Sequence, residues 1–503
     1  MQKIRTRFAP SPTGYLHIGS LRTVLFNYLI SKSLDGKLIL RIEDTDAKRE
    51  VKGAVNKLIE ILNWLGIKFD EGPLVKSETT NFAHPNDLKE VGKFAPYIQS
   101  KRLEIYQKYV KKLLEKKQAY YCFCTSERLI KMRDEQQKLK KPPRYEKACR
   151  NLSQEEIEKR LKLGKKYVIR QKMPLDGDVV VNDELRGEIK FKAKDIEDHV
   201  LIKSNRVPTY QFASVVDDHL MEISHVVRGE EWIPSFPKNI LLYQAFGWLA
   251  PKFIHLPLTL NKEGGKLSKR QGDVAVEDFK LKGYLPEALI NYSILLGWHP
   301  KGDNEVFSLE EAIKQFKIKD MNISPAIFDT TKLDFLNGFY IRKMDIDNLV
   351  ELCKPYLKDN LNKTKDNSKK KDKYIKNVIA LSQERLKKLS EIGELTDFFF
   401  TDKLDYQTDL LVWKKMSLSE VKNNLEEVCG LLEKISEKDW KKEKIEKIVI
   451  EYLKTNNKKI GEYLWPLRVA LTNKAASPGP FEVAEVLGKK ESLIRINKAV
   501  KKL

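Results

Sequence analysis

The sequence predicts an α/β protein with a doubly wound parallel sheet, split by an inserted α+β unit and followed by an all-α C-terminal region. Three observations carry this prediction. Strand and helix patterns alternate over the first 70 residues, mixed patterns interrupt them between 98 and 211, and strand patterns fade after 275. Alternating strands and helices indicate a parallel sheet with covering helices. At about 150 residues per domain, the length suggests three or four domains.

Two strand–helix pairs precede the insertion. Residues 3–9 carry the first strand pattern, which stops at a Pro-Ser-Pro-Thr-Gly turn that can continue neither a strand nor a helix. From Leu21 to Leu29, apolar residues recur at helical spacing and predict a helix. Alternating apolar residues at 38–42 predict the second strand, and 51–65 reads as an amphipathic helix that a glycine ends.

The insertion and the completion of the sheet follow. A Lys-rich helix at 103–117, a Cys-x-Cys pair and mixed strands such as 166–172 mark the insertion. Strand patterns return at 210–219 and 222–228, and 239–246 reads as a helix. Apolar residues beyond 275 recur mostly at helical spacing. The predicted parts are the split α/β domain (1–97 with 212–275), the insertion (98–211) and two helical regions (276–350 and 351–503).

The charge balance favours a polyanionic partner. The chain has 93 Lys and Arg against 71 Asp and Glu, a net charge of +22, which attracts nucleic acid and makes binding sensitive to salt. A lysine-loaded surface without such a partner is the alternative. Segment 363–376 has seven lysines, two aspartates and no apolar periodicity. It predicts a solvated linker or mobile loop, with a nucleic-acid patch as the sharper alternative.

The composition excludes collagen-like, disordered and membrane-spanning classes. Hydrophobic residues make up 41% and charged residues 33% of the chain, which is typical of globular proteins. No apolar run approaches roughly 18 residues, and the first residues lack a secretory apolar core. The five cysteines, at 122, 124, 149, 353 and 429, are too few for a disulfide framework. We therefore expect a cytoplasmic protein with no membrane partner.

Two motifs suit phosphate binding. His17-Ile18-Gly19-Ser20 lies where the first strand gives way to the first helix, and a helix N-terminus offers unpaired N–H groups and a positive dipole end. Lys266 to Arg270 places three cations and a hydroxyl within five residues, which can neutralise charge on a leaving pyrophosphate. Alone, each has a plainer explanation, a surface turn or a solvated basic loop. Together they could form both ends of one phosphate cradle.

These motifs resemble signatures of the class I aminoacyl-tRNA synthetases, and within that family the chain resembles the bacterial glutamyl-tRNA synthetases. His17 to Ser20 resembles the HIGH signature, and Lys266 to Arg270 resembles the KMSKS signature. Four longer segments are more specific: Arg7 to Gly14, Arg41 to Asp46, Pro208 to His219 and Arg228 to Trp232. The resemblance covers essentially the whole chain. It implies a Rossmann-type catalytic domain, an acceptor-binding insertion, a stem-contact region at 276–350 and an anticodon-binding region at 351–503.

The resemblance implies an ATP-dependent glutamate–tRNA ligase. The α-carboxylate of glutamate attacks the α-phosphorus of Mg-ATP, and a ribose hydroxyl of the terminal tRNA adenosine then takes the glutamyl group. Activation would itself require bound tRNA. His17, Lys266 and Lys269 would stabilise charge in the first step, and Mg²⁺ would arrive with ATP. The residues that would bind ATP are His17, Gly19, Glu231, Lys266, Leu267, Ser268, Lys269 and Arg270.

A glutamate substrate has two carboxylates and one ammonium, so its pocket needs cations and an anion. The residues that would bind it by resemblance are Arg7, Ala9, Ser11, Glu43, Tyr210 and Arg228. The two arginines would bind the γ-carboxylate with Tyr210 as a hydroxyl donor, and Ser11 with Glu43 would hold the α-ammonium. The alternative for Arg7, Glu43 and Arg228 is a salt-bridge network at strand ends.

The cysteines resemble the zinc module of some bacterial members. Cys122-Phe123-Cys124 is followed after 24 residues by Cys149, and the module would span 122–151. Members with a Cys-x-His pair would need histidine at 151, where this chain has Asn151. Tyr145 matches a variant in which a tyrosine oxygen is the fourth ligand, and water is the alternative. We expect structural Zn²⁺ on Cys122, Cys124, Tyr145 and Cys149, against a metal-free module with buried or oxidisable thiols.

The helical tail would contact tRNA(Glu), and the resemblance leaves open whether tRNA(Gln) is also charged. Arg385 would match an arginine that reads the third anticodon base in some members. A solvent-facing helix arginine is the alternative. We expect a monomer.

Three other functions compete with this interpretation. A glutamyl transferase that modifies tRNA would lack the long helical tail. A catalytically silent tRNA-binding paralogue would not need the cationic loop and the carboxylate-binding arginines. A glutamine-charging enzyme is disfavoured, because two arginines at the side-chain end favour an anion over an amide.

Overall fold

The computed structural model describes residues 3–12, 14–45, 51, 53–74, 89–265, 267, 275–401, 404–405 and 407–503. Two compact units make up the chain. One comprises residues 1–279 and 289–330, and the other comprises 280–288 and 331–503. Within the described ranges, no helix is both long enough and apolar enough to cross a membrane.

The first unit begins with the predicted β-α-β-α order. Its first elements are β1 (Arg5–Phe8), α1 (Ile18–Ser33), β2 (Lys37–Leu40), α2 (Ala54–Trp64), β3 (Gly72–Leu74) and β4 (Lys89–Val91). Strands β1 and β2 are parallel, and α1 buries Leu21, Leu25 and Leu29 of the predicted apolar stripe. The parallel α/β arrangement predicted for this segment is therefore confirmed.

The catalytic sheet continues after the insertion. Its later elements are β10 (His225–Gly229), η4 (Glu230–Ser235), α7 (Phe236–Phe246), β11 (Lys252–Leu256) and β12 (Thr259–Leu260). Strands β10 and β11 are parallel and fully in register. Ser224, just before β10, donates its N–H to the Arg5 carbonyl at 2.9 Å, which ties β10 to β1. The strand predicted at 222–228 and the helix predicted at 239–246 are thus confirmed.

Segment 210–219 is a helix, and the strand prediction there was wrong. Helix α6 spans Tyr210–Leu220 and buries seven consecutive residues, Phe212 to Asp218. An element buried all round shows no clear polar face, so a short apolar run cannot distinguish a helix from a strand. The surrounding elements decided the outcome, because α6 packs against α7, α3 (Leu103–Glu115) and β9 (Val200–Ile202).

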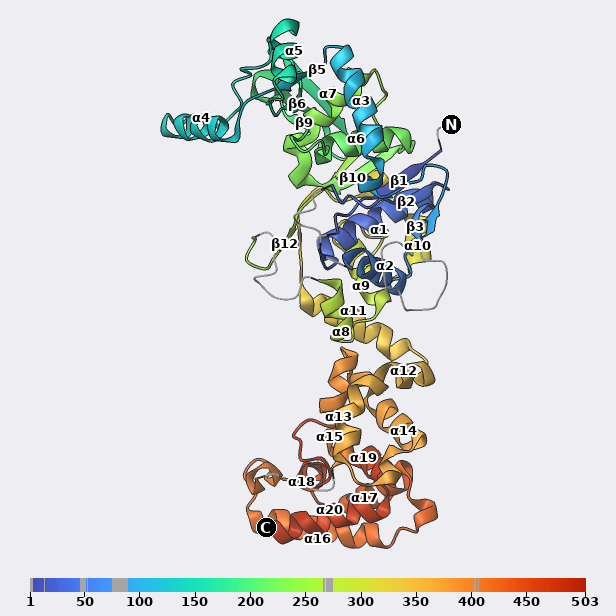
Figure 1. Cartoon of the computed structure of the whole chain (residues 1–503). Coiled ribbons are helices and arrows are strands. Elements are labelled where there is room, and N and C mark those ends of the chain that lie inside the picture. Colours follow the sequence, from blue (N-terminus) through green and yellow to red (C-terminus); the bar gives the residue numbers. More distant parts are fainter. Residues whose placement is uncertain are drawn as a thin grey trace. The chain divides into compact units, whose positions relative to one another are not determined.

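The predicted insertion (green and teal in Figure 1) contains one complete sheet and a hairpin that joins a second sheet. Its remaining elements are η2 (Gln99–Arg102), β5 (Ala119–Cys122), α4 (Ser126–Lys138), α5 (Gln154–Lys162), β6 (Val168–Gln171), β7 (Asp178–Asp183), β8 (Gly187–Lys192) and η3 (Ala193–Asp195). Strands β5, β6 and β9 form an antiparallel sheet. The β7–β8 hairpin instead extends the catalytic sheet, because β7 pairs with β11 in the order β10-β11-β7-β8.

The second unit is helical, as predicted (orange and red in Figure 1). No strand occurs among its described residues. Its helices are α11 (Thr330–Lys343), α12 (Ile346–Cys353), α13 (Lys358–Lys363), α14 (Asp372–Ser382), α15 (Ile392–Phe400), α16 (Leu418–Glu433), α17 (Lys442–Thr455), α18 (Ile460–Thr472), α19 (Pro480–Leu487) and α20 (Lys489–Lys502). Preceding them along the chain are α8 (Val276–Leu281), α9 (Pro286–Leu295), α10 (Leu309–Gln315) and β13 (Ala326–Ile327).

Segment 363–376 is ordered, and its prediction as a linker was wrong. It contains the short helix η8 (Asn367–Lys370) and the start of α14. The Lys369 side chain is buried, and its ammonium donates to the Thr401 carbonyl at 3.2 Å. Ile375 lies in the core of the helical unit. A buried lysine whose ammonium is paired with a carbonyl and one apolar anchor therefore order a segment whose charge suggested solvation.

Candidate active site

A cavity of about 880 Å³ lies at the carboxyl ends of β1 and β10, where parallel α/β sheets bind ligands. Its walls come from the β1–α1 loop, the start of α6 and the turn into η4. Every residue predicted for glutamate or ATP binding that the structure describes lines it: Arg7, Ala9, Ser11, His17, Gly19, Glu43, Tyr210, Arg228, Glu231 and Leu267. Lys266, Ser268, Lys269 and Arg270 lie outside the described residues.

His17 sits at the N-terminus of α1. Its backbone is extended, and its Nδ1 accepts a hydrogen bond from the Gly19 N–H at 3.0 Å. The neutral ring therefore carries its proton on Nε2, which makes Nε2 a donor. The ring caps the helix end that faces the cavity, so His17 and the α1 dipole both favour an anion there.

Leu267 of the predicted basic motif, and Ala275 and Val276 further along the chain, make backbone contacts with residues that line the cavity. The Leu267 N–H donates to the Thr259 carbonyl at 3.2 Å, and the Val276 N–H donates to the Leu16 carbonyl at 2.8 Å. Ala275 forms a β-bridge with His17. Leu267 of the second predicted phosphate motif and His17 of the first therefore line the same cavity.

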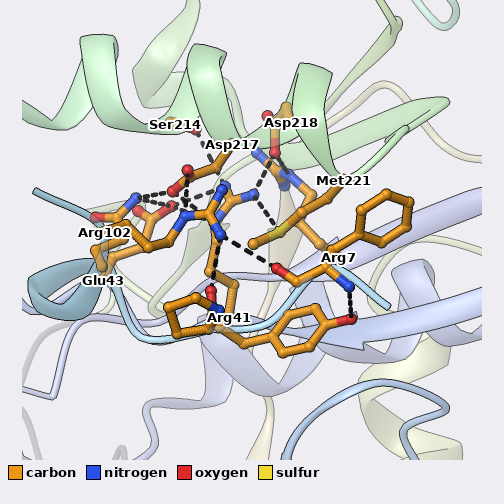
Figure 2. Close-up of polar contacts among 12 residues, drawn as sticks. Arg7, Arg41, Glu43, Arg102, Ser214, Asp217, Asp218 and Met221 are labelled. Atoms are coloured by element: carbon orange, nitrogen blue, oxygen red, sulfur yellow. Dashed lines mark hydrogen bonds and ion pairs between the residues drawn. The ribbon is translucent and has the colours of Figure 1, made fainter. Parts of the chain in front are cut away.

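A buried network of charged residues supports one wall (Figure 2). Arg41 donates to Asp218 at 2.7 Å and to Glu43 at 2.9 Å, and Arg7 donates to the same Asp218 oxygen at 3.0 Å. Burial alone would raise the pKa of Asp218, but the Arg7 and Arg41 charges hold it below its ordinary value. Asp217, beside it, accepts from Arg102 at 2.8 Å. The network fixes both Arg7 and Glu43.

Glu43 has only one of its carboxylate oxygens satisfied. Oε1 accepts from Arg41 and, at 3.4 Å, from Gln99. Oε2 is buried and has no hydrogen-bond partner in the described structure. Burial raises the pKa of Glu43 to about 7 against the opposing charges of Arg41 and Arg7. A cation bound at Oε2 would therefore lower the pKa of Glu43 and favour its ionised form.

Arg228 shows the complementary feature. The side chain is 6% exposed, and its Nε donates to His255 Nε2 at 3.1 Å. One terminal nitrogen, Nη2, is buried and unpartnered in the described structure. Burial lowers the pKa of this guanidinium. Arg228 and Glu43 thus both line the cavity, and each has one buried atom without a hydrogen-bond partner in the described structure. The half-buried Tyr210 interacts electrostatically with both.

Comparisons with known proteins agree with this site. Residues 3–335 match the model of the class I tRNA synthetase (E and Q) catalytic domain, and residues 348–500 match an anticodon binding domain. A glutamate–tRNA ligase of Clostridium botulinum is 44% identical over 100% of this chain and 99% of its own length. One from Clostridioides difficile is 43% identical over 98% of each chain. The chain belongs to the class I glutamyl-tRNA synthetase family.

A solved structure shares the fold of this synthetase throughout. It is a glutamate–tRNA ligase from Elizabethkingia meningosepticum in complex with its amino acid, with 35% identity, full coverage of both chains and a TM-score of 0.87. A glutamate–tRNA synthetase from Elizabethkingia anophelis gives a TM-score of 0.86 over 99% of this chain and all of its own. The predicted family, the Rossmann-type catalytic fold and the helical C-terminal region are therefore confirmed.

Several residues of the synthetase's site were not predicted. Arg41, Asp217 and Asp218 lie within the motif segments Arg41 to Asp46 and Pro208 to His219, and their signal was a charge inside an otherwise apolar run. Such a charge must be paired when buried. Asp183 and His255 gave no usable signal. Asp183 lies in the predicted insertion and meets His255 across 72 residues.

The three predicted zinc cysteines of the synthetase lie together. The Sγ atoms of Cys122, Cys124 and Cys149 lie within 4.8 Å of one another. The Tyr145 hydroxyl is 3.2 Å from Cys122 Sγ and 3.6 Å from Cys124 Sγ, and it accepts the Cys149 N–H at 3.0 Å. Arg170 stacks over the Tyr145 ring at 3.9 Å. All four predicted ligands therefore converge on one point.

The helical unit brings Arg385 close to a second arginine. Arg385 lies exposed in η9 (Gln383–Arg385), and besides burial its charge lowers the pKa of Arg468 on α18. Trp465, three residues earlier on α18, packs its ring 4.9 Å from that of Trp413.

Proposed function

We propose that this synthetase joins L-glutamate to tRNA(Glu) through a glutamyl-adenylate and then transfers the glutamyl group to the terminal adenosine ribose. The observation that carries the proposal is the pair of unsatisfied buried charges, Arg228 Nη2 and Glu43 Oε2, in one cavity. A ligand with a carboxylate at one end and an ammonium at the other would satisfy both. The relatives named glutamate–tRNA ligase support the same substrate.

In this proposal Arg228 and Arg7 bind the γ-carboxylate with Tyr210, while Glu43 and Ser11 hold the α-ammonium. Arg7 keeps its direction because its Nε is committed to Asp218. Glu43 keeps its direction because Oε1 is committed to Arg41. The α-carboxylate, on the same carbon as the ammonium, then faces the α1 N-terminus, where His17 caps the helix.

Adenylate formation needs charge neutralisation at the phosphates. The Nε2–H of His17 and the α1 N-terminus stabilise the α- and β-phosphate oxygens as pyrophosphate leaves. We assign Lys266 and Lys269 the same role from their sequence positions, with Gly19, Glu231, Leu267, Ser268 and Arg270 completing the ATP site. Mg²⁺ enters with ATP as its phosphate complex.

The cysteine cluster fits zinc. A tetrahedron with Zn–S bonds of about 2.3 Å has edges of about 3.8 Å, and Cys124 Sγ lies 3.6 Å from Cys149 Sγ. Tyr145 oxygen stands at a similar distance from two of the sulfurs. We propose that Cys122, Cys124, Cys149 and Tyr145 hold one structural Zn²⁺. When bound, the ion cross-links β5 to the loop at 145–149 and plays no part in catalysis.

The tRNA would contact both units. We assign the acceptor end to 98–211, the stem contact to 276–350 and the anticodon to 351–503. The net charge of +22 and the proximity of two arginines, Arg385 and Arg468, in the helical unit support these assignments. Charging of tRNA(Glu) in preference to tRNA(Gln), a monomeric state and a cytoplasmic location complete the proposal. None of the five cysteines is in a disulfide, which fits a reducing compartment.

The test is side-by-side charging of tRNA(Glu) and tRNA(Gln) transcripts with radiolabelled glutamate or glutamine. We expect ATP-dependent glutamylation of tRNA(Glu) and no charging with glutamine. The matched control is the same transcript without its terminal adenosine, which should accept no label. Label on that shortened transcript would indicate internal tRNA modification, and no label on any transcript would indicate a silent paralogue; either result refutes the proposal.

A further inference from the structure

Three side chains on adjacent strands form a buried chain of hydrogen bonds that ends at the cavity. Asp183 lies at the end of β7, His255 on β11 and Arg228 on β10. His255 and Arg228 are direct neighbours in the parallel register. The exposed fractions are 4% for Asp183, 0% for His255 and 6% for Arg228. Nothing in the proposed reaction above uses Asp183 or His255.

The hydrogen bonds of the chain have a defined direction. Asp183 Oδ2 is 2.7 Å from His255 Nδ1 and accepts the His255 backbone N–H at 3.0 Å. Its other oxygen accepts the N–H groups of Leu185 and Arg186, both at 3.0 Å. The carboxylate is thus an acceptor at every contact, so the His255 proton must be on Nδ1. Nε2 is then left with the lone pair that accepts Arg228 Nε–H at 3.1 Å.

This arrangement holds Arg228 in one orientation. With Nε committed to His255, the guanidinium plane is fixed, and the unpartnered Nη2 is part of the same rigid group. The rings of Phe253 and Phe236, with centroids 5.2 and 6.0 Å from the guanidinium carbon, pack around it without offering an oxygen acceptor. An arginine that is already oriented loses less conformational freedom when it binds a carboxylate.

We propose that His255 is a positioning residue for the side-chain carboxylate of glutamate, acting through Arg228 in the Nδ1–H tautomer that Asp183 imposes. This inference rests on the proposed role of Arg228. Burial and the Arg228 charge lower the pKa of His255, and Asp183 opposes them, so the ring stays neutral at neutral pH and keeps its acceptor. Asp183 comes from the predicted insertion, which therefore supports the amino-acid pocket.

The first test compares His255→Leu with His255→Gln by glutamate titration calorimetry and by steady-state kinetics. Leucine removes the acceptor, and a hydrogen bond to a charged group is worth roughly 10- to 150-fold in affinity. We expect the glutamate Kd and KM to rise in that range, while kcat and the ATP KM stay near wild type. Glutamine restores an acceptor near the Nε2 position and should recover most of the affinity.

The matched control is His225→Leu. His225 is a buried histidine on β10 whose Nδ1 contacts Ser224 Oγ at 2.9 Å, and it does not line the cavity. It should leave the glutamate Kd unchanged. A wild-type glutamate Kd in a folded His255→Leu protein would overturn the inference, as would an equal loss in His225→Leu.

Asp183→Asn tests the tautomer without changing size. The asparagine amide has one acceptor oxygen and one NH2 donor, so it cannot accept from both the backbone N–H groups and His255 Nδ1–H. His255 can then carry its proton on Nε2, where it would face the Arg228 Nε–H donor. We expect weaker glutamate binding although His255 and Arg228 both remain. If His255→Leu fails to fold, Asp183→Asn tests the inference by itself. A wild-type glutamate Kd in Asp183→Asn would overturn the inference.

A double-mutant cycle separates this inference from the proposed function. If His255 acts only through Arg228, then His255→Leu with Arg228→Gln should bind glutamate no more weakly than Arg228→Gln alone. Additive losses would overturn the positioning role and leave the role of Arg228 intact. An Arg228→Gln protein with wild-type glutamate affinity would instead refute the carboxylate site itself.

Discussion

Glutamate binding should depend on pH through Glu43. Burial raises the pKa of this carboxyl from 4.5 to about 7, against the charges of Arg41 and Arg7. Below that pKa the free enzyme holds Glu43 protonated, and a neutral acid cannot pair with the α-ammonium of glutamate. Because the folded pKa is raised, glutamate affinity is full above it and is lost as the pH falls through it.

The size of the effect follows from linkage. If only the ionised carboxylate binds the ammonium, the apparent Kd rises by about twofold at pH 7 and by about tenfold at pH 6 relative to pH 8 for a pKa of about 7. The two carboxylates and the ammonium of the substrate keep their charge across this range. Binding at pH 7 should also release about half a proton, since about half of the Glu43 population must ionise.

Titration calorimetry with glutamate at pH 6, 7 and 8, in two buffers of different ionisation enthalpy, measures the Kd and the proton release together. Glu43→Gln removes the titrating group and should bind glutamate more weakly at pH 8, with little further change down to pH 6. ATP serves as the control ligand, because Glu43 is assigned no part in its binding. A wild-type Kd that is flat from pH 8 to 6, or a Glu43→Gln protein that keeps the slope, would refute the reasoning.

Four further outcomes are expected. Arg228→Gln should lower kcat/KM for glutamate, with a loss of transition-state stabilisation of roughly 2 to 5 kcal/mol, because the variant leaves a buried carboxylate without its cation. An unchanged kcat/KM contradicts the assignment. Lys269→Ala, outside the described residues, should slow single-turnover adenylate formation on the order of a hundredfold, with glutamate affinity retained. Elemental analysis should find about one zinc per chain, lost in Cys122→Ser without loss of the catalytic fold; metal-free protein prepared without chelators would disprove the site. Arg385→Ala should narrow the preference for tRNA(Glu) over tRNA(Gln) by about 1 to 3 kcal/mol, and an unaltered charging ratio removes Arg385 from the anticodon site.

The predicted site residues line the cavity, whereas the residues that pair with them inside the protein were not predicted. Arg7, Glu43 and Arg228 could be predicted by resemblance because they lie within specific motifs. Arg41 and Asp218 could not be assigned, because a sequence does not show that a charge is buried. The pairing of Asp183 with His255 depends on the β7–β11 contact, which joins two segments that the sequence placed in different domains.

The errors in the fold have the same origin. Tyr210 to His219 reads as a strand from its apolar run, yet neighbours on all sides stabilise a helix. Segment 363–376 reads as solvated from its lysines, yet the buried Lys369 ammonium finds the Thr401 carbonyl. In each case a long-range contact overrode a local pattern, whereas the parallel β1–β2 pair, with its local helix connection, was predicted correctly.

The buried charge network explains how the pocket can be selective without a large binding surface. The Arg41–Asp218–Arg7 pairs are satisfied before substrate arrives, so they add rigidity and little net affinity. Glu43 Oε2 and Arg228 Nη2 remain buried and unpaired, which destabilises the empty site. Glutamate relieves both costs. Glutamine could accept the Arg228 N–H through its amide oxygen, but it would bring no negative charge to the two buried arginines and would turn an NH2 donor toward them, so the acid is favoured over the amide.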